Sequence, residues 1–584
     1  MDRLSATGRR LAWAGAAAVP LVFLGIFFAW PVLTLVGRGF FPDGALDLTG
    51  FADVFSRQRT WRIVGLTLAQ STLGTTLAVL LGVPGAYVLY RCRFPGQRLV
   101  RAFVTVPFVL PTVVVGVAFR ALLADGGPLG FLGLDGTFVA IVLALVFFNY
   151  TVVVRTVGGM WARLDPRAAQ AARALGASPT RAFRTVTLPA LGPAIASAAS
   201  VVFLFCATAF GVVLVLGGIR YGTVETEIWI QTTQFLDLRA AAVLSVVQLV
   251  VVVAALLIAS RNRTRQERAL RLRTDEQAGQ PLRLLTRTSR RTSPNSSSAP
   301  VDEQRGLVRR TVGPGPDLLP AVVTAAVVLG LLLSPLAGLV LRSLQTPDGW
   351  GFANYVNLGT TGGPNALTVT VWEATINSLR AAVDATVLAV VVGSLVALVV
   401  SRRPRGRLAR RAVNFFDAAF MLPLGVSAVT VGFGFLITLD EPPLDLRTSP
   451  VLVPIAQAVV AIPLVVRTLL PVLRAIDPRL REAAATLGAT PGRVLATVDG
   501  PFLVRGLGLA VGFAFAVSLG EFGATSFLAR PDRPTLPVVI FRLIGRPGAE
   551  NYGMAMAAAV VLATLTATVM GLAERMRTKE ASQW

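Results

Sequence analysis

The sequence contains no histidine, two cysteines and a single lysine among its 584 residues. Because Cys92 and Cys206 lie far apart and histidine is absent, neither a disulfide framework nor a metal site built from His and Cys is supported. The lysine, Lys579, stands in MRTKEA with no glycine before it, whereas a Walker A phosphate loop needs Gly-Lys-Ser/Thr. The chain therefore has no standard ATP-binding loop, and we expect no catalytic residue, no metal and no cofactor.

Charge is also scarce, and apolar residues dominate. The chain is 54% hydrophobic and only 15% charged, whereas average soluble domains carry roughly 25% charged residues. The apolar residues gather in runs long enough to cross a bilayer of about 30 Å. We predict an all-α polytopic membrane protein with about 12 transmembrane helices. The predicted spans are 11–36, 61–90, 102–123, 137–158, 193–217, 238–260, 318–341, 372–400, 412–438, 450–470, 502–528 and 550–573.

The formal charge of +24 would suggest nucleic-acid binding in a soluble protein. Here the Arg residues cluster in short loops between spans, so membrane topology explains the charge better. Loops 91–101 and 401–411 hold ten Arg and no acidic residue, whereas loops 124–136 and 439–449 hold five acidic residues and one Arg. The positive-inside rule places the first pair, and with it both termini, in the cytoplasm. Loop 529–549, with four Arg on the predicted outer side, disagrees with this scheme.

Two segments, the N-terminus and residues 261–317, differ from the pattern of apolar spans joined by short loops. The N-terminus resembles a signal peptide, but its apolar run continues to Val36, so we predict a retained first span. Residues 261–317 are rich in Arg, Ser, Thr and Pro and cannot form a packed core, which predicts a flexible cytoplasmic tether. The tether separates two units of six spans each, residues 1–260 and 318–584.

The two units are copies of each other. At an offset of 312, residues 165–189 match residues 477–501 at 13 of 25 positions. Because six spans is an even number, both units share one orientation. We therefore predict two parallel repeats related by a pseudo-two-fold axis normal to the membrane. The same offset aligns Phe210-Gly211 with Phe522-Gly523 and Thr223 with Thr535, and an offset of 311 aligns Trp61 with Trp372 and Gly82 with Gly393.

The most similar stretch of the two units is a polar loop between apolar spans. In the second unit Asp477-Pro478 predicts the start of a helix, and Gly488 predicts its end in the left-handed conformation. Thr490-Pro491 predicts the start of another helix. Asp165-Pro166, Gly176 and Ser178-Pro179 repeat the pattern in the first unit. Each loop is therefore predicted to form a short helix, a turn and a second helix.

In these loops the chain resembles the permease subunit of type I binding-protein-dependent ABC importers. That family carries an "EAA" loop, with Gly after three further residues and a later Pro. The second loop, about 475–504, fits with Glu482-Ala483-Ala484, Gly488 and Pro501. The first, about 163–192, has Gln170-Ala171-Ala172, Gly176 and Pro189, so it lacks one charge. Two copies in one chain resemble the fused ferric-iron and thiamine permeases.

The resemblance implies a function. It implies that the chain is a transport subunit and no enzyme, in the cytoplasmic (inner) membrane. The two loops would dock on two copies of a cytoplasmic ABC ATPase, while an extracytoplasmic solute-binding protein delivers a small solute. The docking residues implied by the motif are Gln170, Ala171, Ala172, Gly176, Glu482, Ala483, Ala484 and Gly488.

A translocation path between two such halves would pass near their axis. We name Glu521, Phe522, Gly523, Phe210 and Gly211 as candidates for its lining. Glu521 sits late in an apolar span, where ionisation is costly unless the carboxylate faces water or a partner. The alternative roles for Glu521 are a position at the outer interface and a bond to a broken helix end. Pro107 and Pro423 are predicted to kink their spans.

Several alternatives remain at this point. A secondary transporter or channel would need coupling-ion carboxylates in both halves, and a membrane-tethered nucleic-acid binder would use the Arg-rich tether. Among solutes, ferric iron and thiamine lead because of the fused architecture. Sulfate and molybdate stay open because SLGEFGATSFLARPDRPTLPVVIF, residues 518–541, is similar to a segment of their permeases, and a polyamine also stays open.

Overall fold

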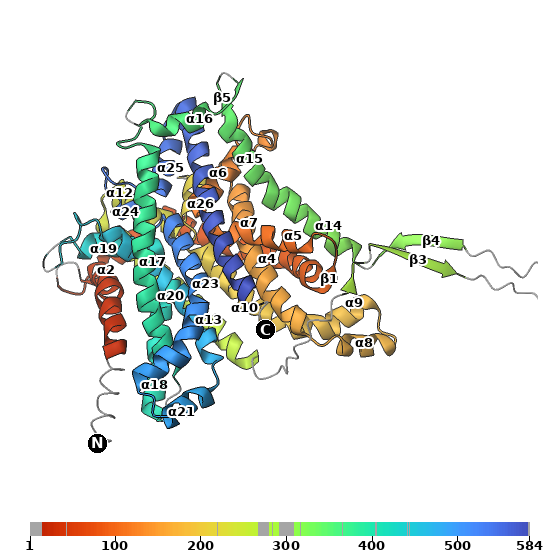
Figure 1. Ribbon diagram of the computed structural model, residues 1–584. Coiled ribbons are helices and arrows are strands. Elements are labelled where there is room, and N and C mark those ends of the chain that lie inside the picture. Colours follow the sequence, from red (N-terminus) through yellow and green to blue (C-terminus); the bar gives the residue numbers. More distant parts are fainter. Residues whose placement is uncertain are drawn as a thin grey trace, which may run out of the picture.

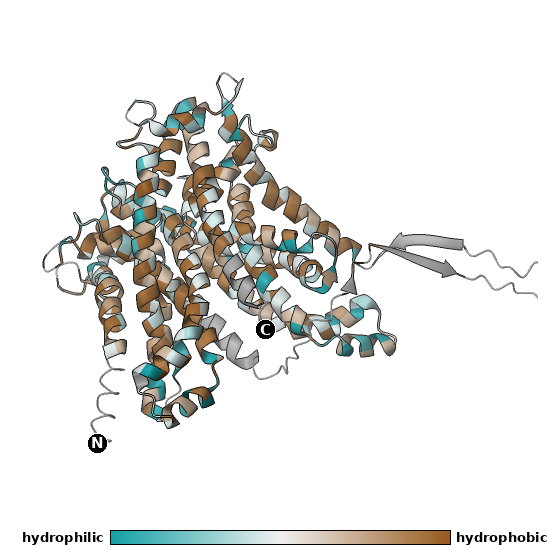
Figure 2. Cartoon of the chain, in the orientation of Figure 1, coloured by the Kyte–Doolittle hydropathy of each residue, from teal (hydrophilic) through white to brown (hydrophobic). Residues whose placement is uncertain are grey.

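The computed structural model describes residues 15–581, except 42–43, 219, 267–279, 283, 291–308, 316, 348, 365, 403–405, 441 and 443. Helices form one bundle, and Figure 2 shows that their sides are mostly hydrophobic. Within these residues nine helices are long and apolar enough to cross a membrane, and three bent pairs of helices raise the number to as many as 12. The prediction of an all-α polytopic membrane protein is confirmed.

The first half runs from the N-terminal span to a long helix that leads toward the linking segment (Figure 1). Its elements are η1 (Gly25–Ala29), α2 (Trp30–Phe40), α3 (Thr49–Ser56), α4 (Gln58–Arg91), β1 (Cys92–Arg93), α5 (Gln97–Val109), α6 (Thr112–Leu123), η2 (Gly130–Leu132), α7 (Phe138–Arg163), α8 (Arg167–Ala174), α9 (Pro179–Ala182), η3 (Phe183–Thr187), α10 (Leu188–Ala207), α11 (Gly211–Gly217), α12 (Val224–Thr233) and α13 (Leu238–Gln266).

The second half follows the same order of helices. Its elements are α14 (Leu318–Ala326), η5 (Val327–Leu333), α15 (Ser334–Leu344), β5 (Gln345–Thr346), β6 (Gly349–Trp350), α16 (Ala353–Val356), η6 (Asn357–Gly359), α17 (Val371–Ser401), α18 (Arg407–Gly425), α19 (Ala428–Thr438), α20 (Leu452–Arg474), α21 (Pro478–Thr486), α22 (Pro491–Val494), η7 (Leu495–Asp499), α23 (Gly500–Gly520), α24 (Thr525–Leu528), α25 (Leu536–Ile544) and α26 (Ala549–Ala581).

The segment between the halves was predicted to be a flexible tether, and much of it lies outside the described residues. The described part contains β2 (Gln280–Pro281), which pairs in parallel with β1. It also contains β3 (Leu285–Arg290), which pairs antiparallel with β4 (Arg309–Pro314). An all-helical prediction omits these short strands, as it omits the antiparallel pair β5 and β6.

Matching close contacts occur in the two halves. Helix α4 packs on α7, and α17 packs on α20 in the same way. A Cβ atom added to Gly82 would lie 2.6 Å from Cγ1 of Val153, and one added to Gly393 would lie 2.7 Å from Cγ1 of Val465. Glycine therefore lets the long span approach its neighbour closely in both halves, as small residues do at helix interfaces in membranes.

A second pair of contacts repeats at the starts of α12 and α25. The backbone N–H of Val224 donates to Oγ1 of Thr67 at 3.1 Å. The backbone N–H of Leu536 donates to Oγ of Ser378 at 2.7 Å. A free N–H at a helix start is thus satisfied by a hydroxyl of the long span in each half, which agrees with the pseudo-two-fold relation predicted from the repeat.

The first span of each half packs against the opposite half. Leu24 and Phe28, from the N-terminal span, lie in a core made otherwise by the second half. Val327 and Leu332, from η5, lie in the core of the first half. The two halves therefore clasp each other, so the division of the sequence at 261–317 is no division of the hydrophobic core.

Four predicted continuous spans are wrong in one respect, because each is interrupted. The chain bends by 107° between α5 and α6 and by 91° between α18 and α19. The third bend, of 55°, lies inside α23 between Val504 and Gly506, and non-helical residues separate α10 from α11 and α23 from α24. Pro107 and Pro423, predicted to be the kinks, lie inside α5 and α18, and the bends follow a few residues later, where the cap residues Leu110 and Val426 are extended.

Replacing Gly82 or Gly393 by Ala tests the paired close approach. Each new methyl group would overlap a β-branched valine that cannot rotate away, so we expect a loss of about 1–3 kcal/mol in stability. Thermal unfolding of the purified chain in detergent, followed by size-exclusion chromatography, measures this loss. Gly65→Ala in α4 is the matched control, since a Cβ there meets nothing within 4 Å. Equal melting temperatures for Gly65→Ala and Gly82→Ala would contradict the packing argument.

Candidate functional site

The two polar loops adopt the same local structure. The Asp165 carboxylate accepts a hydrogen bond from the N–H of Arg167 at 2.9 Å, and Asp477 accepts one from Arg479 at 2.9 Å. These bonds satisfy free amides at the starts of α8 and α21. The helix of each loop is short because the chain reverses at a glycine one residue beyond its C-cap.

The turn after each helix is a Schellman motif. Gly176 has φ +89° and Gly488 has φ +80°, the left-handed region that favours glycine. The N–H of Ala177 donates to the carbonyl of Ala172 at 3.1 Å, and the N–H of Ala489 donates to Ala484 at 3.0 Å. The sequence pattern of Asp-Pro, Gly and a second Pro therefore encodes one rigid shape twice.

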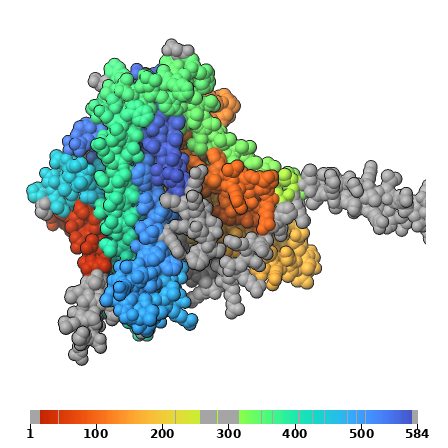
Figure 3. Space-filling model, in the orientation of Figure 1, coloured from red at the N-terminus to blue at the C-terminus, as the bar shows by residue number. Residues whose placement is uncertain are grey.

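Both loops lie at the same end of the bundle. In Figure 1 α8 and α21 are at the lower end, away from α16 and β5 at the upper end. The space-filling view shows them as separate projections (Figure 3). Gln170, Glu482, Ala171 and Ala483 are exposed, and Ala172 and Ala484 are half-buried.

An exposed leucine stands at the tip of each loop, directly before the left-handed glycine. Leu175 is 89% exposed and Leu487 is 87% exposed. The two positions correspond at the offset of 312. An exposed large apolar side chain at the tip is therefore a feature that the two loops share. Neither leucine was predicted as a site residue, although the two positions lie in the aligned repeat.

The two loops differ in how they are anchored. Asp499 is fully buried and bridges two arginines: Oδ1 accepts from Nε of Arg481 in α21 at 2.7 Å, and Oδ2 accepts from Nη2 of Arg402 at 2.6 Å. Arg402 follows the long span α17, so the bridge ties the second loop to that span. The position equivalent to Asp499 in the first half is Thr187, which offers no charge.

The helix interruptions lie in pairs, one pair in each half, and the two pairs meet across the halves at Phe210 and Phe522. An added Cβ on Gly211, at the start of α11, would lie 2.6 Å from Oγ1 of Thr112, at the start of α6. One on Gly523, before α24, would lie 2.9 Å from Cβ of Ala428, at the start of α19. We call this region, where α6, α11, α19 and α24 begin, the seam. Broken helices are tolerated at membrane depth only where protein covers them or they line a cavity.

The structure brings four of the predicted path residues together at the seam. Phe210 and Phe522 stack on each other with ring centroids 5.4 Å apart and an interplanar angle of 20°. Phe210 belongs to the first half and Phe522 to the second half. Gly211 and Gly523 follow the two rings in sequence and allow the chain of each half to pass close to its neighbour. An added Cβ on Gly211 would also lie 3.3 Å from Cδ1 of Phe522.

The carboxylate of Glu521, the fifth predicted path residue, forms its hydrogen bonds with residues three and four positions later in the chain. One carboxylate oxygen accepts from the N–H of Ala524 at 2.7 Å, and the other accepts from the N–H and the hydroxyl of Thr525, both at 3.0 Å. The carboxylate thus caps the free amides of α24. This geometry corresponds to the alternative role of bonding a broken helix end.

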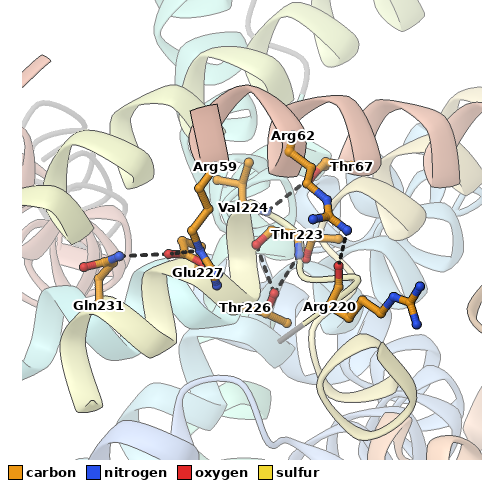
Figure 4. Close-up of polar contacts among 9 residues, drawn as sticks. All are labelled: Arg59, Arg62, Thr67, Arg220, Thr223, Val224, Thr226, Glu227 and Gln231. Atoms are coloured by element: carbon orange, nitrogen blue, oxygen red, sulfur yellow. Dashed lines mark hydrogen bonds and ion pairs between the residues drawn. The ribbon is translucent and has the colours of Figure 1, made fainter. Parts of the chain in front are cut away.

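Another polar cluster surrounds the start of α12 (Figure 4). Glu227 accepts two hydrogen bonds from Nε of Arg59 and one from Nη2, at 2.8–3.1 Å, and one from the amide of Gln231 at 2.8 Å. Thr223 and Thr226 form a capping box at the same helix. This network fixes α12 against α4, and it leaves the neighbouring Glu225 on a different side of the helix.

Asp499→Asn tests the anchor of the second loop. The neutral amide would leave both guanidinium groups poorly compensated, at a local cost of about 2 kcal/mol. We expect amide hydrogen exchange in residues 478–486 to become about tenfold faster or more. Thr187→Asn, at the equivalent position of the first half, is the control and is expected to leave exchange in residues 167–174 unchanged. Unaltered protection of residues 478–486 in Asp499→Asn would show that the bridge does not hold the loop.

Comparison with known proteins agrees with this architecture. Residues 74–266 match the family described as binding-protein-dependent transport system inner membrane component. The thiamine transport system permease protein ThiP of Brucella abortus (strain 2308) is 26% identical over 576 residues, which cover 96% of this chain and 94% of that protein. ThiP of Escherichia coli (strain K12) is 26% identical, covering 87% of this chain and 88% of that protein.

Two further similarities cover less than half of the chain. The sulfate transport system permease protein CysT of Salmonella typhimurium is 32% identical over 236 residues, 39% of this chain and 84% of that protein. A solved bacterial ABC transporter involved in import of the acidic polysaccharide alginate aligns with 46% of this chain at 18% identity and a TM-score of 0.39. On the family match and the similarity to CysT, the chain belongs to the family of binding-protein-dependent transport system inner membrane components.

Proposed function

We propose that this chain is the fused permease of an ABC importer for thiamine. Similarity to thiamine permeases along nearly the whole chain supports the solute, because those relatives have both halves in one polypeptide. Coupling to an ATPase is supported by the pair of matching loops at one end of the bundle, each with an exposed leucine at its tip. Residues 1–260 and 318–584 are the two permease units in this proposal.

The proposed partner of the loops is a cytoplasmic ABC ATPase, one copy for each loop. The chain has no Walker A lysine of its own, so the energy must come from another polypeptide. Helices α8 and α21 would seat in clefts of the two ATPases with Gln170, Ala171, Ala172 and Gly176 in one and Glu482, Ala483, Ala484 and Gly488 in the other. Leu175 and Leu487 would be the apolar anchors at the centre of each contact.

The proposed orientation follows from the loops and the positive-inside rule. The docking end, with both termini, lies in the cytoplasm of the cell and a solute-binding protein docks at the opposite end. The Arg-rich segment 529–549, which disagrees with this orientation, is partly neutralised. Arg530 pairs with Asp532 at 3.0 Å and donates to the carbonyl of Thr448 at 2.6 Å.

The alternatives have less support. A secondary transporter would need ion-binding carboxylates in both halves, yet Glu521 aligns with Ala209 and is occupied as a helix cap. A nucleic-acid binder would leave the paired loops unexplained. Among solutes, sulfate relatives match only 39% of the chain, whereas ThiP relatives match up to 96%. Ferric iron, molybdate and polyamines rest on the sequence resemblance alone.

Leu175→Asp combined with Leu487→Asp tests the docking surfaces. A carboxylate buried in an apolar cleft costs at least about 2 kcal/mol without a partner, so we expect about tenfold less ATPase to copurify with the permease. Affinity purification of the tagged permease from membranes, with the ATPase quantified by mass spectrometry, measures this. Leu46→Asp, at a leucine that is 64% exposed between α2 and α3, is the control. Full recovery of the ATPase with the double variant would refute the docking role of the loops.

ATP-dependent uptake tests the solute. Liposomes containing the permease with its ATPase and binding protein should accumulate radiolabelled thiamine, and the accumulation should stop when the ATPase cannot hydrolyse ATP. Excess unlabelled thiamine should abolish the signal, and excess sulfate or spermidine should not. Uptake of labelled sulfate, iron or spermidine without uptake of thiamine would overturn the assignment of the solute while leaving the importer mechanism in place.

A further inference from the structure

The stacked pair at the seam belongs to a larger aromatic group with the symmetry of the repeat. Phe210 contacts Trp229 with centroids 6.4 Å apart, Trp229 meets Phe541 edge-on at 5.8 Å, and Phe541 contacts Phe522 at 5.4 Å. Together with the Phe210–Phe522 stack, these contacts close a circuit of four rings. We call these four residues the aromatic circuit.

The circuit contains two equivalent pairs. Phe210 aligns with Phe522 at the offset of 312, and Trp229 aligns with Phe541 at the same offset. Each half therefore contributes one ring from a broken span and one ring from the short helix that follows it, α12 or α25. Rings arranged in this way surround the pseudo-two-fold axis, which is where a path between the halves must pass.

One carboxylate beside the aromatic circuit has an oxygen without a hydrogen-bond partner among the described residues. Glu225 lies one helical turn before Trp229 on α12, so the two side chains lie on the same side of that helix. Its exposed fraction is 0%. Oε2 accepts from the hydroxyl of Ser427, in the other half, at 2.5 Å, whereas Oε1 has no hydrogen-bond partner among the described residues.

The surroundings do not compensate the charge of Glu225. No described arginine forms an ion pair with it, although Glu227 two residues later is held by Arg59. The amide of Gln248 donates to the carbonyl of Ala207 at 3.1 Å and lies close enough to interact with Glu225, but it is neutral and brings no compensating charge. Nε1 of Trp229 is likewise buried without a partner in the described part of the chain. A buried carboxylate with a free oxygen is costly unless a cation reaches it.

We propose that the aromatic circuit and Glu225 form the intramembrane binding site for a flat organic cation. In the present structure the site is closed, because Phe210 and Phe522 stack on each other. When the halves separate, an aromatic cation replaces the lost ring contact by stacking between the two phenyl groups, and its charge faces the aromatic rings and the free Oε1 of Glu225. The opening also breaks the Ser427–Glu225 bond between the halves, which frees the second carboxylate oxygen for the solute.

The chemistry of the site selects among solutes. A planar ring bearing a positive charge satisfies both the stacking surfaces and the carboxylate, and the thiazolium of thiamine is such a ring. Sulfate and molybdate are anions, which the carboxylate repels, and they offer no ring. This inference rests on the proposed function for the identity of the solute, but the site itself is assigned from the contacts at the seam.

The test uses liposomes that contain the complete complex of permease, ATPase and binding protein. Glu225→Gln keeps the shape of the side chain but removes the charge, and Phe522→Leu removes one stacking surface. We expect thiamine uptake to fall about tenfold or more in each variant, while ATP hydrolysis stimulated by the binding protein stays within about twofold of wild type. Phe522→Tyr keeps the ring and is expected to retain most of the uptake.

Two control variants remove the same chemical groups away from the seam. Glu550→Gln removes an exposed carboxylate at the start of α26, and Phe131→Leu removes a phenyl ring that is 81% exposed. Both should transport thiamine as wild type does. ATP hydrolysis stimulated by the binding protein shows that each seam variant is folded and still coupled to the ATPase. If Phe522→Leu fails this check, Phe541→Leu takes its place.

Equilibrium binding separates recognition of charge from a general loss of the site. The complex is trapped with ATP and vanadate in lipid nanodiscs, and labelled thiamine is competed with an uncharged analogue in which thiophene replaces thiazolium. Glu225→Gln should weaken thiamine about tenfold or more and change the affinity of the analogue less than twofold. Equal loss of both ligands, or wild-type affinity for thiamine, would overturn the proposed role of Glu225.

The outcomes also distinguish this inference from the proposed function. If wild-type liposomes accumulate no thiamine, the proposed solute is wrong, and the site as a thiamine site falls with it. If wild type accumulates thiamine and both Glu225→Gln and Phe522→Leu match it, the function stands and the site is refuted.

Discussion

The constraint on which this structure depends is that backbone amides and carbonyls inside a bilayer must be satisfied within the protein. In the described residues nine helices meet this requirement as continuous spans and three bent pairs bring the number to as many as 12, with helix interruptions near Phe210, Phe522, Thr112 and Ala428. These interruptions are possible because each half covers the broken ends of the other. The Glu521 carboxylate closes one of them by binding the amides of α24. Helix interruptions are therefore found where the two halves contact each other at Phe210 and Phe522.

Much of this arrangement follows from local sequence signals. The loops were predictable because Asp-Pro, a left-handed Gly and a second Pro each act through a few neighbouring residues. The repeat was predictable because equivalent contacts need equivalent residues, as the pairs of Gly82 with Val153 and Gly393 with Val465 show. The stacking of Phe210 on Phe522 follows from the same logic, since residues near a two-fold axis meet their own counterparts.

Residues that have a role in only one half could not be predicted from the sequence, because comparison of the repeats detects only what both halves share. Glu225 aligns with Pro537 and Asp499 aligns with Thr187, so neither stands out in the alignment. Periodicity could not locate the interruptions either, since apolar residues continue through Thr208–Phe210 and a helix that ends inside a bundle keeps the composition of its neighbours. The first span of each half packs against the opposite half. A hydrophobic run in the sequence shows that a span exists but does not indicate which helices it will contact.

The connection between the two polar loops and the seam is short and direct in each half. Helix α10 spans 20 residues from Leu188 to Ala207 and ends three residues before Phe210, while α23 spans 21 residues and ends two residues before Phe522. A straight helix of that length extends about 30 Å, roughly the thickness of the hydrocarbon core, and α23 bends by 55° between Val504 and Gly506. Each loop thus leads, through one helix, to one ring of the stacked pair.

The two connections differ in stiffness, and the difference has a physical cause. Both begin with a five-residue π-helical turn, η3 and η7, but only η7 ends in Asp499, which bonds the second loop through Arg481 and the long span through Arg402. Movement of α21 therefore reaches α17 and α23 together, whereas the equivalent position in the first half, Thr187, makes no such bridge. A displacement of equal size at the two loops would move the second half as a more rigid unit, so the stacked rings would separate mainly by motion of Phe522 away from Phe210. Glu225, on the first half, would then keep its position beside Trp229 while the ring opposite it withdraws. Opening of this kind exposes the carboxylate without displacing it, which is the geometry that capture of a cation requires.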